Sequence, residues 1–240
     1  MTERPAGTPL LFAVERLDLR LTPKRWNFAE EQRAEIGAFF EAAQHDNPAL
    51  WNGRVLLMHR QRVADGVFSG DYLETDYASF AAWKAWGQPK AGIHDCFGAA
   101  AVVSADNAVL LGVMGPQTFN AGRVYFPCGT PDPDDIVDGR VDLAASIARE
   151  LKEETGCAVA DFDAAPGWTT VVDGGLIAQV RTLRSAETAA ALRERIRAHL
   201  AQERTPELSD IRIVRGLGDV DAAMPRFVVA FLAHHFGAGA

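Results

Sequence analysis

The stretch from Arg149 to Cys157, Arg-Glu-Leu-Lys-Glu-Glu-Thr-Gly-Cys, constrains this 240-residue chain more than any other part of its sequence. Leucine and isoleucine recur every four residues through this region, at Leu143, Ile147 and Leu151. That spacing places the three side chains on one face of a helix. The sequence therefore predicts an amphipathic helix whose apolar face is buried against other elements.

The same helix has end signals and a strongly acidic face. Asp142 is a suitable N-cap, and Gly156 is a suitable residue to end the helix. Glu150, Glu153 and Glu154 lie at positions i, i+3 and i+4, so their side chains converge on one patch. Like charges at this spacing repel one another, whereas hard divalent cations such as Mg²⁺ or Mn²⁺ prefer clustered carboxylate oxygens. The patch indicates either a metal site or a solvated acidic face.

The residues around this helix resemble a known family motif. Gly129, followed by Arg149-Glu150-Leu151-x-Glu153-Glu154-x-Gly156-Cys157, is similar to the Nudix box, G-x5-E-x7-R-E-U-x-E-E-x-G-U, where U is a bulky aliphatic residue. The front half departs from that pattern. Gly129 and Arg149 are 20 positions apart where the pattern has 14, and Val141 stands where the pattern has its first glutamate. Cys128 and Cys157 replace a frequent glycine and the final aliphatic residue.

The resemblance implies an α/β fold, namely a Nudix α/β/α sandwich with a mixed sheet over residues 91–240. Residues 1–90 are expected to form a small N-terminal αβ extension. In the extension, the patterns predict strands at 10–21, 54–60 and 66–75, and helices at 28–44 and 77–86. In the second part, they predict helices at 142–156, 186–203 and 227–235, a Pro-, Asp- and Gly-rich loop at 127–141, and strands at 97–104, 108–114, 123–126, 168–172, 176–183 and 211–214.

The resemblance also implies roles for individual residues. It implies that Mg²⁺ or Mn²⁺ is held by the carboxylates of Glu150, Glu153 and Glu154, and by the carbonyl of Gly129 if the long loop keeps its usual path. A further acidic ligand from a later loop is expected at Glu207, with Glu203 as the reserve; both are otherwise surface residues. Glu150 or Glu154 would also act as the base for the attacking water. Arg149, beside Glu150, is placed to orient a carboxylate.

Two short segments of the extension narrow the expected substrate. Asn-Pro-Ala-Leu-Trp-Asn-Gly at 47–53 and Tyr-Ala-Ser-Phe at 77–80 are similar to elements that precede the box in Nudix hydrolases acting on UDP-glucose and UDP-galactose. The implied reaction is hydrolysis of the pyrophosphate bond of a UDP-sugar to UMP and a sugar 1-phosphate. Asn52, Arg54, Arg60 and Arg123 are candidate substrate contacts; the alternatives are a turn for Asn52 and solvated charges for the arginines.

Other substrates and one other class of protein stay open. ADP-ribose or a coenzyme A-type diphosphate is the alternative substrate. A Nudix domain that binds a nucleotide without cleaving it is the alternative class, although such a domain would be expected to lose the metal glutamates. The chain contains neither a G-x-S-x-G nucleophile motif nor a phosphate-binding G-x-x-x-x-G-K-[ST] loop. A serine hydrolase and a P-loop enzyme are therefore not expected.

Composition sets the remaining expectations. The net charge of −8 and the pI near 5.3 argue against a nucleic-acid partner, which usually meets a basic face. Three cysteines in unrelated contexts suggest neither a disulfide framework nor a zinc site, which favours a reducing cytoplasmic location. No run of 18 apolar residues and no signal peptide is recognised, so no membrane association is expected. The expected partner is a small-molecule nucleoside diphosphate, and the resemblance is compatible with a homodimer.

Overall fold

The computed structural model describes residues 7–48, 50–89 and 92–237, which form two compact units. The first, here called the nine-stranded unit, contains the described residues of 1–15, 97–129 and 144–240. The second, the five-stranded unit, contains those of 16–96 and 130–143. Both units are therefore discontinuous in sequence, whereas the sequence suggested a single boundary near residue 90. The division into an extension and a catalytic domain stays a prediction.

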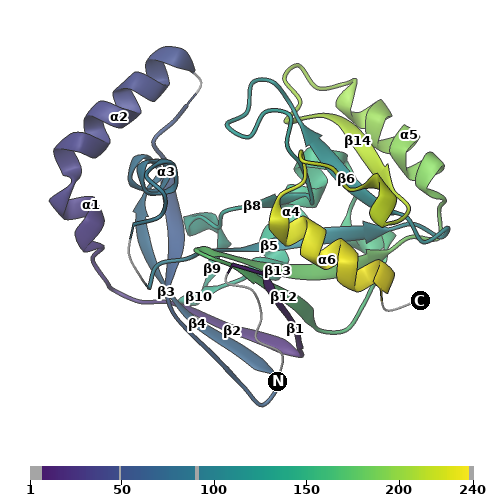
Figure 1. Ribbon diagram of the computed structural model, residues 1–240, viewed down its shortest axis with the longest axis horizontal. Coiled ribbons are helices and arrows are strands. Elements are labelled where there is room, and N and C mark those ends of the chain that lie inside the picture. Colours follow the sequence, from purple (N-terminus) through teal and green to yellow (C-terminus); the bar gives the residue numbers. More distant parts are fainter. Residues whose placement is uncertain (1–6, 49, 90–91, 238–240) are drawn as a thin grey trace. The chain divides into compact units, whose positions relative to one another are not determined.

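The nine-stranded unit is built on one sheet with the strand order β1-β12-β13-β5-β6-β14 (Figure 1). Three short strands join this path: β11 pairs with β13, β7 with β6 and β8 with β5. The strands are β1 (Leu10–Val14), β5 (Asp95–Val103), β6 (Val109–Met114), β7 (Val124–Tyr125), β8 (Cys128–Gly129), β11 (Asp163–Ala164), β12 (Trp168–Asp173), β13 (Leu176–Arg184) and β14 (Leu208–Val214).

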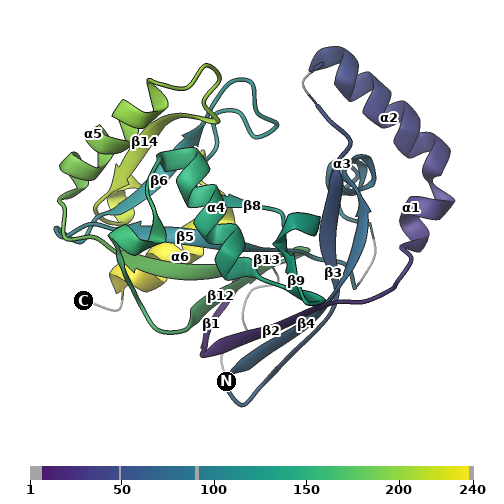
Figure 2. The same ribbon diagram turned by 180° about the vertical axis from the view of Figure 1, so that it is seen from behind.

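Alternate residues of β5 face two different cores, as the two-residue period of a strand requires. Ala99 and Ala101 belong to a cluster with Phe227 and Phe231 of α6 (Arg226–Gly237). Ala100 belongs to a second cluster, which contains side chains of α4 (Leu143–Thr155) and α5 (Ala189–Leu200). Figures 1 and 2 show α6 on one side of the sheet and α4 on the other. The unit is an α/β/α sandwich, as predicted.

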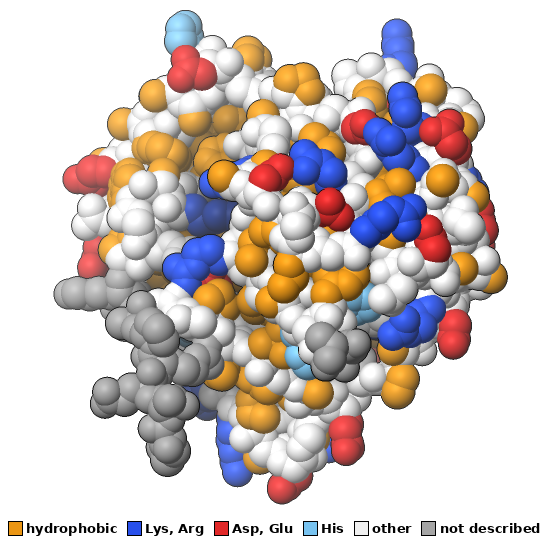
Figure 3. Space-filling view, turned by 45° about the vertical axis from the view of Figure 1, so that its right-hand side comes forward, with side chains coloured by type: hydrophobic (Ala, Val, Ile, Leu, Met, Phe, Trp, Pro, Cys, Tyr) orange, Lys and Arg blue, Asp and Glu red, His pale blue; other side chains and the backbone are white. Residues whose placement is uncertain are grey.

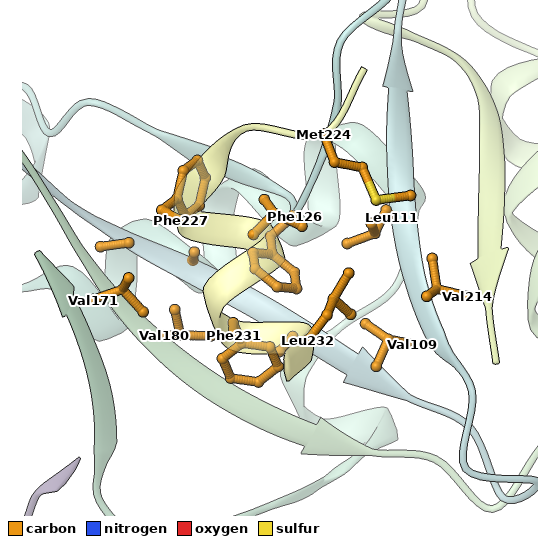
Figure 4. Packing of buried hydrophobic residues seen from close by; sticks show 14 of the residues in the cluster. Val109, Leu111, Phe126, Val171, Val180, Val214, Met224, Phe227, Phe231 and Leu232 are labelled. Carbon is orange, nitrogen blue, oxygen red and sulfur yellow. The ribbon is translucent and has the colours of Figure 1, made fainter. Parts of the chain in front are cut away.

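Aromatic rings fill the core beneath α6 (Figure 4). The ring centroid of Phe126 lies 5.1 Å from that of Phe231 in an edge-on arrangement, and 6.2 Å from that of Phe227. Val109 and Leu111 of β6 close the same cluster from the sheet. Edge-on aromatic pairs at these separations are favourable beyond the area that they bury. This core therefore fixes the short segment that leads from β7 to β8.

The five-stranded unit has a mixed sheet with the order β3-β4-β2-β10-β9. Its strands are β2 (Arg16–Leu21), β3 (Arg54–Ala64), β4 (Val67–Asp76), β9 (Ile136–Val137) and β10 (Arg140–Val141). β2 pairs with β4 in parallel, and the other printed pairs are antiparallel. Asp65 and Gly66, with φ angles of 50° and 72°, form the tight turn between β3 and β4.

Helices cover this second sheet in two layers. Phe80 and Trp83 of α3 (Tyr77–Ala85) are buried against β3 and β4, so these aromatics are core residues rather than an exposed interface. Ile36 and Phe40 of α2 (Arg33–Asp46) pack on the other side of α3. Asp76 is the N-cap of α3, because its carboxylate accepts a hydrogen bond from the Ser79 N–H.

The structure corrects three predicted elements. The strand predicted at 10–21 is two strands, β1 and β2, which belong to different sheets and separate at Glu15. The helix predicted at 28–44 is broken at Gln32 into α1 (Asn27–Glu31) and α2, whose buried residues join different clusters. Hydrophobic periodicity predicts which face of a helix or strand is buried, but not which element that face packs against. It could therefore not predict the break at Glu15 or the break at Gln32.

The third correction concerns the loop predicted at 127–141. It contains β8, the 3₁₀ helix η1 (Pro133–Asp135), and the hairpin of β9 and β10. Asp138 and Gly139 turn the hairpin with φ angles of 50° and 72°, and Asp132 caps η1. Strands of two residues leave no readable alternation in the sequence. Two further 3₁₀ helices, η2 (Val159–Asp161) and η3 (Leu217–Asp219), complete the described elements.

Basic and acidic side chains are interspersed on the face seen in Figure 3. Several arginines of the nine-stranded unit form ion pairs with nearby carboxylates, for example Arg212 with Asp221 at 2.9 Å and Arg215 with Asp106 at 2.7 Å. The charges of these arginines are therefore compensated locally. In the part of the chain that the structure describes, no helix is long and apolar enough to cross a membrane.

Substitution of Phe231 tests the core beneath α6. Because Phe231 is buried between Phe126 and the sheet, Phe231→Ala should lower the free energy of unfolding by about 3–5 kcal/mol. Phe119→Ala, which truncates an exposed ring of the same unit, should change it by less than about 0.5 kcal/mol. Urea unfolding followed by circular dichroism gives both values, and equal losses would contradict this packing.

Candidate active site

Helix α4 begins and ends where the sequence predicted. Ile147 and Leu151 are fully buried in the core that α4 shares with α5, β6 and β14. The helix ends at Gly156, whose φ of +71° suits glycine, and Lys152 Nζ donates a hydrogen bond of 2.9 Å to its carbonyl. With the apolar face held in this way, the acidic face is turned away from the α4–α5 core.

The three glutamates of that face have different surroundings. Glu153 is exposed, and the side chain of Glu150 is only 13% exposed. Glu154 is 4% exposed, and its Oε2 atom has no hydrogen-bond partner. A buried carboxylate oxygen without a partner is unfavourable in a folded protein. Sequence spacing predicted that the three residues cluster, but could not show that Glu154 is the buried one.

Arg149 and Gly129 both contact Glu150. The Arg149 Nη1 atom donates a hydrogen bond of 2.7 Å to Glu150 Oε1, so the arginine orients this carboxylate as predicted from its position. A Cβ atom added at Gly129 would lie 2.6 Å from the same oxygen, closer than real Cβ atoms approach. A side chain at this position would therefore displace the Glu150 carboxylate from its place beside β8. The two halves of the motif come together even though six additional residues separate them.

The Glu154 carboxyl group is electrostatically strained. The backbone N–H of Cys128 donates a hydrogen bond to it, which favours its ionised form. Burial and the negative charges of Glu207, Glu150 and Glu153 outweigh that bond and raise the pKa of Glu154 well above its usual range. The carboxyl group therefore needs either a proton or a cation.

Glu207 lies at the start of β14, close to the glutamates of α4. Its backbone carbonyl accepts a hydrogen bond of 2.7 Å from Gly115 N–H, which fixes the backbone beside the end of β6. The residue is exposed, yet neighbouring protein atoms partly desolvate its carboxyl group. This desolvation and the charge of Glu153 raise the pKa of Glu207. Glu207 therefore belongs to the same acidic cluster, whereas the reserve candidate Glu203 forms an ion pair of 3.1 Å with His199.

Two polar residues near the cluster were not identified from sequence. Asn120 Nδ2 donates a hydrogen bond of 3.1 Å to the hydroxyl oxygen of Tyr125. Burial raises the pKa of Tyr125, and the charges of Cys128, Glu154 and Glu207 add to this rise. The phenol is thus within electrostatic range of the same carboxylates. No motif in the sequence identifies Tyr125, because its role depends on where β7 lies in the sheet.

The donors suit a hard divalent cation, although none of the described residues form a ready-made metal-binding group of three or more His, Cys, Asp or Glu side chains. The chemistry of the set fits, since Mg²⁺ and Mn²⁺ prefer oxygen ligands. The unpartnered Oε2 of Glu154 and the glycine cradle at Glu150 are the structural features that fit it. The ligand roles of Glu150, Glu153, Glu154, Gly129 and Glu207 stay predictions.

The predicted substrate contacts are divided between the two units. Asn52 and Arg54 belong to the five-stranded unit, where Asn52 Oδ1 accepts a hydrogen bond from Ala78 N–H and Arg54 pairs with Glu74 at 2.7 Å. Arg123 belongs to the nine-stranded unit and donates to the carbonyl of Ala222. These contacts give each residue a structural role, and the substrate-binding roles stay predictions.

Comparison with known proteins gave matches only among solved structures. No protein-family model and no curated protein matches the chain. Among solved structures, the chain is similar to the crystal structure of a Nudix hydrolase from M. smegmatis, RenU, with 16% sequence identity and a TM-score of 0.36. The match covers 61% of this chain and 86% of that chain. Function must therefore be inferred from the site itself.

The raised pKa of Glu154 predicts a pH dependence of stability in the presence of EDTA. Between the unfolded glutamate pKa of about 4.3 and the raised folded value, the folded state binds more protons than the unfolded state. The free energy of unfolding should therefore fall as pH rises through this window. Glu154→Gln should remove this contribution and stabilise the metal-free protein at neutral pH.

Glu194→Gln is the matched control, because it removes the same charge from an exposed helical position that does not contribute to the raised pKa of Glu154. Urea unfolding between pH 5 and pH 8 measures the difference. If wild type and Glu154→Gln lost stability in parallel over this range, Glu154 would not be the strained group.

Proposed function

We propose that this protein is a metal-dependent hydrolase of the Nudix type, which cleaves the pyrophosphate bond of a nucleoside diphosphate linked to another group. The proposal rests on the surroundings of two carboxylates of α4. Glu154 is buried with an unpartnered oxygen, and Glu150 is held between Arg149 and Gly129. Both belong to the Arg-Glu-Leu-x-Glu-Glu-x-Gly sequence that resembles the Nudix box.

Glu150, Glu153 and Glu154, with Glu207 and the carbonyl of Gly129, would hold Mg²⁺ or Mn²⁺. Bound there, such a cation would neutralise the diphosphate oxygens and lower the pKa of a water molecule. The chain's own contribution is to hold the carboxylates of Glu150 and Glu154 where water has little access. The raised pKa of Glu154 is the electrostatic consequence of that placement.

The surroundings of the two buried glutamates suggest different roles. Arg149 compensates the charge of Glu150 and fixes its orientation, which suits a ligand. Glu154 retains an oxygen with no partner and a high affinity for a proton, which suits a general base that accepts a proton from the attacking water. Of the two candidates that the sequence left open, Glu154 is therefore our preferred base.

A UDP-sugar is the first choice of substrate, on the basis of the segments at 47–53 and 77–80. ADP-ribose and coenzyme A-type diphosphates are the alternatives within the same chemistry. In the five-stranded unit, Asn52 Oδ1 accepts from the N–H of Ala78. This bond ties the first segment to the start of the second, so a recognition role would involve both together.

A substrate panel tests the reaction and the substrate. UDP-glucose, UDP-galactose, ADP-ribose, NADH and coenzyme A are incubated with Mg²⁺ or Mn²⁺, and products are separated by chromatography. We expect UMP and sugar 1-phosphate from the UDP-sugars, and no product once EDTA is present. Cleavage of ADP-ribose or coenzyme A alone would support pyrophosphate hydrolysis but would refute a UDP-sugar as the substrate. Nucleotide binding without any product would favour the non-catalytic alternative, and a rate indifferent to EDTA would exclude the metal mechanism.

Glutamine variants test the assignment of the site. Glu150→Gln and Glu154→Gln should each lower kcat by about a thousandfold, because several kcal/mol of transition-state stabilisation are lost. Gly129→Ala should also lower kcat, since its new methyl group displaces the Glu150 carboxylate. Glu194→Gln, at a side chain that is exposed on α5, should behave as wild type. Wild-type turnover of Glu154→Gln at saturating Mg²⁺ would show that the site is misplaced.

A further inference from the structure

The loop between β6 and β7, residues 115–123, presents one aromatic ring to solvent. Phe119 is 53% exposed and belongs to none of the described buried clusters. The loop around it is ordered by backbone hydrogen bonds, including Thr118 N–H to the carbonyl of Gly115 at 3.1 Å and Gly122 N–H to that of Met114 at 3.0 Å. Thr118 Oγ1 also donates to the Gly115 carbonyl at 2.9 Å. The ring is therefore displayed by a fixed backbone.

Both sides of this loop form hydrogen bonds to residues beside the acidic cluster. On one side, Gly115 N–H donates to the carbonyl of Glu207, and the Gln117 side chain donates to the carbonyl of Pro206. On the other side, the residue next to Phe119, Asn120, donates to the hydroxyl of Tyr125. The Tyr125 phenol in turn lies within electrostatic range of the Glu154 and Glu207 carboxylates. The loop that carries Phe119 is thus held beside the proposed catalytic site by its own neighbours, Gly115, Gln117 and Asn120.

A single exposed apolar side chain is common on protein surfaces and needs no explanation by itself. Leu217 in η3, which is 52% exposed, is such a residue in the same unit. Phe119 differs from it in chemistry and in place, because it offers a flat aromatic face on a loop that is hydrogen-bonded to Glu207 and Tyr125. A nucleoside diphosphate has a matching aromatic base, joined to the diphosphate through one ribose.

We propose that Phe119 is the stacking platform for the nucleobase of the substrate. This inference rests on the proposed function and adds the part of the substrate that the nine-stranded unit recognises. Stacking on an aromatic side chain tolerates any base, because every base has a π-face. The platform would therefore supply affinity for the nucleoside half, with little preference among bases. The group beyond the second phosphate would be recognised elsewhere.

Product inhibition separates the two halves of the substrate. Phe119→Ala should raise the inhibition constant of UMP and the KM for UDP-glucose by about five- to a hundredfold, as expected for the loss of one stacked base. The inhibition constant of glucose 1-phosphate and kcat should stay within twofold, because the lost contact is the same in the ground and transition states. Phe119→Trp should bind UMP at least as tightly as wild type. Leu217→Ala is the matched control.

Titration calorimetry with UMP gives a readout that does not depend on turnover. The dissociation constant should rise in Phe119→Ala and in Phe119→Leu, since leucine keeps apolar area but has no π-face. If ADP-ribose proves to be the substrate, AMP and ribose 5-phosphate replace the two probes. UMP affinity equal to wild type in Phe119→Ala, or an equal loss for both products, would overturn the platform while leaving the hydrolase intact. Absence of turnover in the wild-type enzyme would instead refute the proposed function.

Discussion

A carboxyl group buried beside other carboxyl groups is the constraint on which the nine-stranded unit depends. Transfer of an ionised carboxylate out of water costs several kcal/mol even after the protein relaxes. Glu154 bears this cost with one oxygen unpartnered and three acidic neighbours. A chain that needed only stability would have a neutral residue at this position. Perturbed carboxyl groups of this kind cluster at functional sites, and this tendency supports the proposed role of Glu154.

The fold keeps the strained group in place from the opposite side of its helix. Ile147 and Leu151 are buried among residues of α5, β6 and β14, and this packing fixes the rotation of α4 about its own axis. The same core contains Leu208, the residue after Glu207. One apolar cluster therefore positions both the helix carboxylates and the acid that comes from β14. Catalytic groups need such support, because errors of about 1 Å in their position can lower rates severely.

The sequence was most informative where a pattern is local. The bounds of α4, its buried face and the hairpin of β12 and β13 all follow from spacing and turn residues within a few positions. The sequence was least informative where the structure of a segment depends on which distant element it packs against or pairs with. Strands β1 and β2 form one alternating run in sequence but join different sheets. Likewise, spacing grouped the three glutamates of α4, whereas only the tertiary structure buries Glu154 and brings Tyr125 near it.

The contact between Gly129 and Glu150 forms although 20 positions separate Gly129 from Arg149. Gly129 lies against Glu150 because β8 pairs with β5, with Gly129 opposite Gly98. That register is set by the sheet and does not depend on how many residues follow. The residues that follow Gly129 are themselves structured, since Arg140 of β10 pairs with Arg20 of β2 in the five-stranded sheet. The strand pairing of β8 and the separate pairing of β10 together explain why the contact between Gly129 and Glu150 does not require a short connection between them.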